Sequence, residues 1–325
     1  MKKIYITVFL SFFLLFYFLF ITQDTFACDY CLLSQGLSPL DTTSGKGIRI
    51  EERFTPLTTK YKDGSKTDNP DNDEESHLVT QVTGFYSVTE NLTLMAVAPF
   101  VKRVHKETHT HVHEDGEIEK QRHEGTQTGL ADVLLIGRYS FFKRHELDSS
   151  TIIAGQFGIK LPTGKTDGRD DKGEFIDPHG QLGSGSTDYL IGANLSHVVN
   201  RFTLSSNILY GITTEGKFGE TRHQFGNNFN YDVTGIYRIY PEVPPGKTVS
   251  LALGVAGELK DKERSGGETV DNSGGHTVYL NTGILTIPYP QWIAELQYKP
   301  GIIHQLNGTQ LGEDYRLHLA LTYVF

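Results

Sequence analysis

Large apolar residues occupy every second position over the last eleven residues of the chain, from Tyr315 to Phe325. The positions between them are mostly polar or small. A strict period of two places one set on one face of a β-strand and the other set on the opposite face. This segment therefore predicts a strand with one apolar and one polar face. The apolar set is Tyr315, Leu317, Leu319, Leu321, Tyr323 and Phe325.

Similar segments recur along the chain. Alternating or β-rich runs predict about twelve strands, near 46–55, 77–89, 92–104, 129–142, 150–162, 186–199, 202–213, 224–240, 248–261, 276–287, 291–304 and 312–325. The connections alternate between short turns and long polar segments, the long ones at 56–76, 105–128, 163–185, 214–223, 262–275 and 306–311. This order is typical of single-chain outer-membrane barrels. The sequence predicts an all-β fold, an antiparallel transmembrane β-barrel of about 12 strands over residues 46–325, with periplasmic termini and long external loops.

The N-terminus predicts export. Lys2 and Lys3 precede a short apolar run from Val8 to Ile21, and small residues stand before Cys28. This arrangement predicts a signal peptide at 1–27, with a retained anchor helix as the alternative. Residues 28–45 are then a short periplasmic segment. The expected location is the bacterial outer membrane of a Gram-negative cell, after cleavage of the signal peptide.

The final strand ends on Phe325 with no tail. A terminal amphipathic strand of this kind resembles the C-terminal signal that the barrel-assembly machinery reads, so Tyr323 and Phe325 are the predicted assembly signal. The expected partners are this machinery, outer-membrane lipid, lipopolysaccharide and a small solute. The net charge of -9 offers no basic surface for nucleic acid.

Strand parity also predicts which charged residues face the lumen, because Lys or Arg on the lipid face costs about 2–4 kcal/mol near the midplane. The charges nearly balance, so we expect little gross ion selectivity. An open aqueous pore is the first interpretation, and a sealed, ion-paired interior is the alternative. The predicted pore-lining residues are Arg49, Glu51, Arg53, Asp132, Arg138, Lys160, Asp188, Asp232, Arg238, Glu258, Lys260, Glu295, Lys299, Asp314 and Arg316.

Three motifs in the middle of the chain carry a family resemblance. They are GLADVLLIGRYSFF at 129–142, GIKLPTGKTDG at 158–168 and LGSGSTDYLIGANLSH at 182–197. This stretch of about seventy residues resembles the "transporter / MetA-pathway of phenol degradation" family of outer-membrane proteins. The resemblance implies an outer-membrane passage protein but not its solute. Phenol is not carried over, because the predicted lumen is charged.

Cys28 and Cys31 are the only cysteines, in a Cys-x-x-Cys pair at the predicted mature N-terminus. In the oxidising periplasm the pair can form a disulfide, and it can also bind a soft metal ion. Lipidation of Cys28 is a third interpretation.

A His-rich segment at 105–123 is the second metal candidate. His109, His111 and His113 alternate, so an extended chain projects them to one side. Together with His105 and His123 they offer neutral imidazole ligands for Zn²⁺, Cu²⁺ or Ni²⁺. A polar surface loop, and a titratable gate near the mouth, are the alternatives. No cofactor is expected to be required.

An enzyme is the competing class, since some outer-membrane barrels are hydrolases. No Gly-x-Ser-x-Gly motif occurs, and a Ser–His–acid set cannot be assembled from spacing alone. The sequence therefore predicts a non-enzymatic outer-membrane pore or transporter for passive passage of a small solute, with divalent-metal handling through the His-rich loop. A structural or receptor barrel with a sealed lumen is the alternative. The acidic segment at 167–177 is a candidate to fold inward as a constriction.

Overall fold

The computed structural model describes residues 45–325, except 113–117, 171, 174 and 242–246, and it leaves out the side chains of 107–123. Among the described residues, no helix is long and apolar enough to span a membrane.

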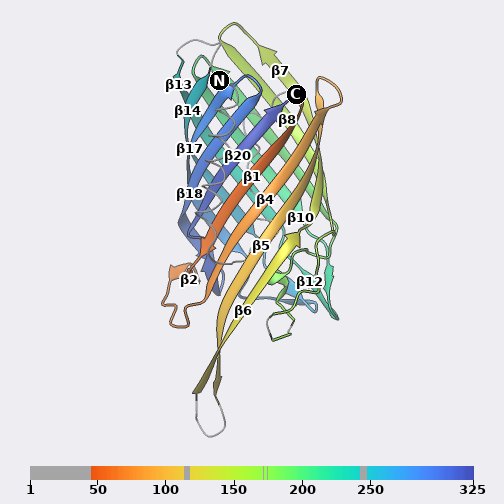
Figure 1. The fold of residues 1–325 in the computed structure, drawn as a ribbon, viewed down its shortest axis with the longest axis vertical. Coiled ribbons are helices and arrows are strands. Elements are labelled where there is room, and N and C mark those ends of the chain that lie inside the picture. Colours follow the sequence, from red (N-terminus) through yellow and green to blue (C-terminus); the bar gives the residue numbers. More distant parts are fainter. Residues whose placement is uncertain (1–44, 113–117, 171, 174, 242–246) are drawn as a thin grey trace, which may run out of the picture.

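Twelve antiparallel strands form a closed barrel (Figure 1). Each strand pairs with its neighbours in sequence. The last strand pairs with the strand before it and also with the first strand, which closes the sheet. The strands are β1 (Lys46–Leu57), β4 (Glu74–Ser87), β5 (Leu92–Val112), β7 (Val133–His145), β8 (Ser149–Leu161), β9 (Asp188–Val199), β10 (Phe202–Ile212), β13 (Asn228–Tyr240), β14 (Thr248–Lys260), β17 (Gly275–Tyr289), β18 (Trp292–Leu306) and β20 (Tyr315–Val324). The predicted fold class is confirmed.

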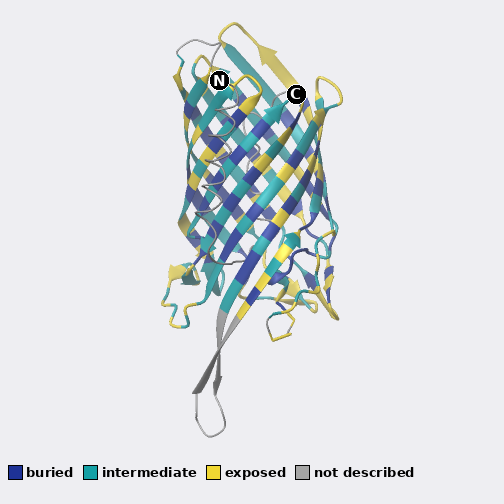
Figure 2. Ribbon diagram, viewed as in Figure 1, coloured by how far each residue is buried: buried dark blue, intermediate teal, exposed yellow. Residues whose placement is uncertain are grey.

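The two faces of the strands differ in burial, as Figure 2 shows by the alternating colours along each strand. On β14, Leu251, Leu253 and Val255 are exposed on the outside, whereas Ser250 and Glu258 are buried. Apolar side chains on an outer face that is exposed in the isolated chain are what a lipid environment requires. The period of two read from the sequence thus sets the two faces of the wall.

Long and short connections separate to opposite ends of the barrel, and both ends of the described chain lie with the short turns (Figure 1). The long connections carry small sheets of their own. One comprises β2 (Thr59–Lys62), β3 (Ser65–Lys66) and β19 (Thr309–Gly312). The other comprises β11 (Gly216–Phe218), β12 (Thr221–Gln224), β15 (Arg264–Ser265) and β16 (Glu268–Thr269). Loops far apart in sequence are therefore joined by backbone hydrogen bonds.

One long connection differs from the prediction. Residues 105–128 were expected to be a polar loop, but β5 continues to Val112 and pairs with β6 (Ile118–Leu130). The two strands form a hairpin that extends well beyond the barrel (Figure 1). The pairing is possible because Thr, Val and His alternate here without Gly or Pro, so the extended backbone of β5 is not interrupted.

Candidate functional site

The inner wall of the barrel carries most of the charged residues predicted to line a pore. Cross-strand register places Arg49, Glu51 and Arg53 opposite β20, and Glu295 and Lys299 beside the same strand. The buried members of the predicted set are Glu51, Arg53, Asp132, Arg138, Lys160, Asp188, Asp232, Glu258, Glu295, Lys299 and Arg316. Whether they line an open pathway stays a prediction.

Asp314 lies at the rim of the barrel. It precedes β20, and its carboxylate accepts hydrogen bonds from the backbone N–H and the hydroxyl of Thr58, at 2.8 and 2.9 Å. The neighbouring Glu313 is buried and contacts Arg316. The prediction missed Glu313 because β20 begins only at Tyr315, so the alternation of the strand does not fix side chains before it.

Two groups of ion pairs lie on the wall formed by β1, β20, β18 and β14. In the first, Arg49 Nη2 contacts Glu51 Oε2 at 3.1 Å, and the same guanidinium contacts Glu295. In the second, Arg316 Nη2 contacts Glu258 Oε2 at 2.8 Å. Arg49 and Glu295 have one strand between them, and Arg316 and Glu258 have two. Opposite sides of a twelve-stranded barrel are six strands apart, so these pairs run along the wall and not across the lumen.

Lys160 is the centre of a third group at the end of the barrel that carries the long loops. Its ammonium lies 2.6 Å from Asp188 Oδ2 and 3.3 Å from Asp132 Oδ2. Asp132 also accepts hydrogen bonds from the backbone N–H groups of Gly164 and Ser184, both at 2.8 Å. These residues belong to the three motifs that carried the family resemblance. The motifs therefore meet in space, and they fix the loop between β8 and β9 to the barrel.

The same loop folds inward over the barrel end. Arg103, on the inner face of β5, donates hydrogen bonds to the carbonyls of His179 and Gln181, the former at 2.9 Å. Gln181 is fully buried, and Leu182 packs with the inward-facing Val79 and Val101. The part of the loop that folds inward thus comprises residues 178–186. The segment that was predicted to fold inward, residues 167–177, directly precedes it.

The inner wall is not charged all round. Val97, Leu134 and Leu190 form a buried apolar cluster on β5, β7 and β9, with Ile136 and Leu209 packed against it. The charged pairs of Arg49 and Arg316 lie on other strands, β1, β20, β18 and β14. Lys160 on β8 and Asp188 on β9 are nonetheless charged and buried on this same part of the wall. The cluster is therefore an apolar patch in a wall that also carries charge there.

A hollow of about 1100 Å³ runs along β4, β5, β7, β8 and β9. Several of its lining side chains, including Leu135, Tyr139 and Phe157, are exposed and lie on the apolar outer face. We therefore assign this hollow to the face toward lipid and do not count it as part of the lumen.

The residues predicted to bind metal are only partly described. His105 Nδ1 lies 3.3 Å from Glu75 Oε1 at the base of the β5–β6 hairpin. In the backbone register of β5 with β6, the position of His109 is opposite Gln121, that of His111 opposite Glu119, and that of His123 opposite Glu107. His113, Cys28 and Cys31 lie outside the described residues. Metal binding by this set stays a prediction.

No known protein family profile matches the sequence, and no curated protein is similar to it. Solved structures do resemble the barrel. The COG4313 outer membrane channel from Pseudomonas putida F1 aligns with a TM-score of 0.63 and 16% identity, over 87% of this chain and 96% of that one. At this identity the likeness shows a shared fold.

Two further barrels align more weakly. The NanC porin covers 85% of this chain and 100% of its own with a TM-score of 0.41 and 8% identity. A Pseudomonas aeruginosa FadL homologue covers 86% of this chain and 90% of its own, with a TM-score of 0.40 and 10% identity.

Proposed function

We propose that this protein is an outer-membrane channel for passive passage of a small solute, and that it is not an enzyme. The observation that carries the proposal is the direction of the lumen ion pairs. Because the described ion pairs of Arg49 with Glu295, Lys160 with Asp188 and Arg316 with Glu258 join nearby strands, these pairs neutralise charge along the wall without bridging the barrel. A sealed, ion-paired interior would instead need pairs between opposite walls.

The apolar patch in the charged wall suggests the chemistry of the solute. Paired charges such as Lys160 and Asp188 offer hydrogen-bonding partners, while Val97, Leu134 and Leu190 form an apolar patch on the same strands or their neighbours. A small molecule with an apolar body and one polar or charged group makes favourable contacts with both kinds of surface. The inward loop at 178–186 narrows the mouth, which limits the size of that molecule.

The adjacent residues Ser196 and His197 on β9 give the enzymatic alternative no support. Because they are neighbours on one strand, their side chains project to opposite faces of the sheet. His197 Nδ1 is hydrogen-bonded to Thr151 Oγ1 at 2.8 Å. A serine and histidine on opposite faces cannot act as nucleophile and base.

Single-channel conductance of the refolded mature chain in a planar bilayer tests the proposal. We expect discrete conductance steps with weak preference between K⁺ and Cl⁻, since charges of both signs line the wall. A chain that folds, shown by heat-modifiable gel mobility, but gives no steps would contradict the proposal and favour a structural or receptor barrel. A variant lacking residues 178–186 should conduct more than the wild type, because the inward loop is removed.

Metal handling by the β5–β6 hairpin is a second proposal, supported by the alternation of His109, His111 and His113 in the sequence and by the extended backbone of β5 as far as Val112. The hairpin would concentrate a divalent ion at the mouth, with lumen carboxylates as further binding positions. Replacing the three histidines by Ala should weaken Zn²⁺ or Cu²⁺ binding and reduce metal uptake by cells. Unchanged binding and uptake would overturn this part while leaving the channel proposal intact.

A further inference from the structure

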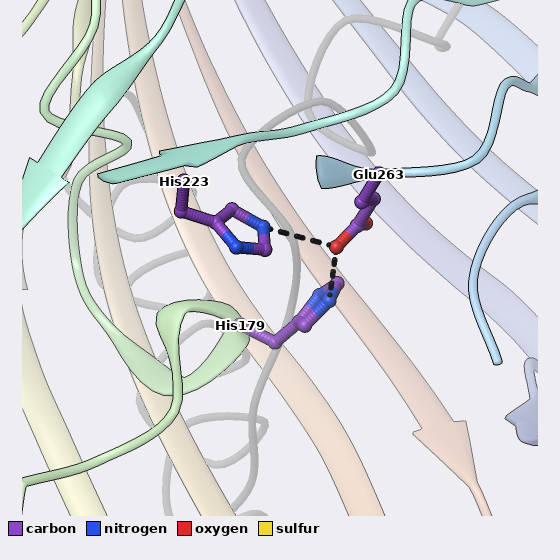
Figure 3. Close-up of side chains that lie close together, drawn as sticks. All are labelled: His179, His223 and Glu263. Atoms are coloured by element: carbon purple, nitrogen blue, oxygen red, sulfur yellow. Dashed lines mark hydrogen bonds and ion pairs between the residues drawn. The ribbon is translucent and has the colours of Figure 1, made fainter. Parts of the chain in front are cut away.

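Three long loops meet at one point on the barrel end. His179 lies in the short 3₁₀ helix η3 (Pro178–Gly180), His223 lies in β12, and Glu263 immediately precedes β15. Figure 3 shows both imidazole rings turned toward the Glu263 carboxylate. His179 Nε2 lies 2.8 Å, and His223 Nε2 3.1 Å, from the same oxygen, Glu263 Oε2. All three ligand atoms lie within 4.8 Å of one another.

We propose that His179, His223 and Glu263 form a binding site for a divalent transition-metal ion, with Zn²⁺ as the best fit. Two imidazole nitrogens and one carboxylate oxygen form a ligand set that suits Zn²⁺. Ca²⁺ and Mg²⁺ fit poorly, because they need more oxygen ligands than this cluster offers. None of these three residues belongs to the predicted hairpin and cysteine ligands.

The distances agree with the size of the ion. Ligand bonds to Zn²⁺ of about 2.0–2.1 Å in a tetrahedral arrangement put neighbouring ligand atoms roughly 3.3 Å apart. The two contacts to Glu263 are 2.8 and 3.1 Å, so each of these two pairs needs to separate by only about 0.2–0.5 Å to admit the ion. The two imidazole nitrogens lie within 4.8 Å of each other and need to approach by at most about 1.5 Å. Side-chain rotation alone supplies a movement of this size. The half-exposed ring of His179 leaves one side of the cluster open for a water ligand.

The ligands are held in place by their own backbones and neighbours. The side chain of Asp177 accepts a hydrogen bond from the backbone N–H of His179 at 2.9 Å, and Arg103 binds the carbonyl of His179. The backbone N–H of Glu263 donates to Ser273 Oγ at 2.9 Å. His223 pairs with Ser265 across β12 and β15. A preformed set of ligands loses less conformational freedom when an ion binds.

Two aromatic rings form a partial shell that covers one side of the cluster. The ring of Phe225 lies 4.8 Å from His223 and 5.5 Å from His179, measured between centroids, and Phe218 lies 5.8 Å from His223. Both phenylalanines are buried. Such a shell excludes water and lowers the local dielectric, which strengthens the attraction between a cation and its ligands. Burial by itself raises the pKa of Glu263, but the two histidines outweigh it and hold that pKa well below its usual value.

The ion would act as a clip between loops. His179 belongs to the inward loop between β8 and β9, His223 to the loop after β10, and Glu263 to the loop after β14. Occupancy would therefore fix the inward loop to the sheet of β11, β12, β15 and β16. This consequence does not depend on what the channel carries, so the metal site and the channel proposal can fail separately.

Isothermal titration of the folded, untagged chain with Zn²⁺ tests the site. The background variant carries Asn at His105, His109, His111, His113 and His123 and Ser at Cys28 and Cys31, so that the other predicted ligands do not contribute. We expect one Zn²⁺ per chain in this background. Co²⁺ at the same site should give the intense visible absorption of a tetrahedral complex.

Glu263→Gln and His223→Gln in this background should each weaken Zn²⁺ binding on the order of a hundredfold or more, since even outer-shell changes cost 10–100-fold. Glu268→Gln, an exposed acid in the same loop, and His145→Ala, near a short turn, serve as matched controls and should bind as the background does. His179→Ala is a third ligand variant, and because His179 is half-exposed this variant should fold even if the two buried variants do not. A background variant that binds no Zn²⁺, or folded Glu263 and His223 variants that bind it unchanged, would overturn the proposal and leave a hydrogen-bonded contact between loops.

Discussion

Asp132 holds the inward loop to the barrel, and its replacement by Asn is the sharpest test of that role. The carboxylate accepts three hydrogen bonds from the loop, one from Gly164 N–H and two from the backbone N–H and hydroxyl of Ser184, the last at 2.7 Å. Asn keeps one accepting oxygen. Its NH₂ group then faces the Ser184 donors and the Lys160 ammonium, so donors meet donors.

The size of the effect follows from these contacts. Each hydrogen bond to a charged group contributes about 1.5–3 kcal/mol, and Asp132→Asn removes the two from Ser184. The Ser184 hydroxyl can still donate to the backbone carbonyl of Ser186, at 3.4 Å, so we take the lower end, about 3 kcal/mol. At about 1.4 kcal/mol per factor of ten, the loop should open more than roughly a hundredfold more often.

Amide hydrogen exchange of the folded chain in detergent micelles measures this opening. Exchange in residues 178–186 should accelerate by that factor, while amides in the middle of β14 and β17 stay protected. Asp167→Asn, an exposed acid in the same loop, is the matched control and should exchange as the wild type does. Wild-type protection of residues 178–186 in a folded Asp132→Asn variant would refute the argument that this carboxylate fixes the loop.

Three further predictions address the wall and its assembly. Leu253→Arg, at an outer position that is 62% exposed, should lower the free energy of unfolding of the vesicle-embedded barrel by about 2–4 kcal/mol. Ala252→Arg, on the inner face, should cost clearly less, and equal losses would argue against the assigned faces. Arg316→Met removes the cation that Glu258 and Glu313 share. Lys260 remains 3.2 Å from Glu258, so we expect the lower end of the cost of breaking a buried pair, about 3 kcal/mol in urea titrations. The same substitution should also shift conductance toward cations, and unchanged selectivity would place these carboxylates away from the ion path. Deletion of Phe325 should reduce the yield of folded barrel in cells relative to Lys46→Ala, a change at the facing end of β1, and equal yields would remove Phe325 from the assembly signal.

The period of two along each strand is a local property, and the sequence alone determined what depends on it. Alternation predicted the twelve barrel strands, eleven of them to within four residues at each end, while β5 runs eight residues past its predicted end. It also predicted the apolar outer face and the buried positions of Lys160 and Glu295 on the opposite face. The order of short and long connections also followed from local composition. These features need no knowledge of which residues meet.

Only the tertiary structure decided which side chains become partners. His179, His223 and Glu263 lie 40 and 84 residues apart along the chain in their hydrogen-bonded pairs, and none stands in a recognisable ligand motif. They meet because closing the barrel brings three loops to one end and joins β12 to β15. The same closure brings Asp132, Lys160 and Ser184 together. Contacts between loops depend on the barrel's closure and register, and no local pattern records them.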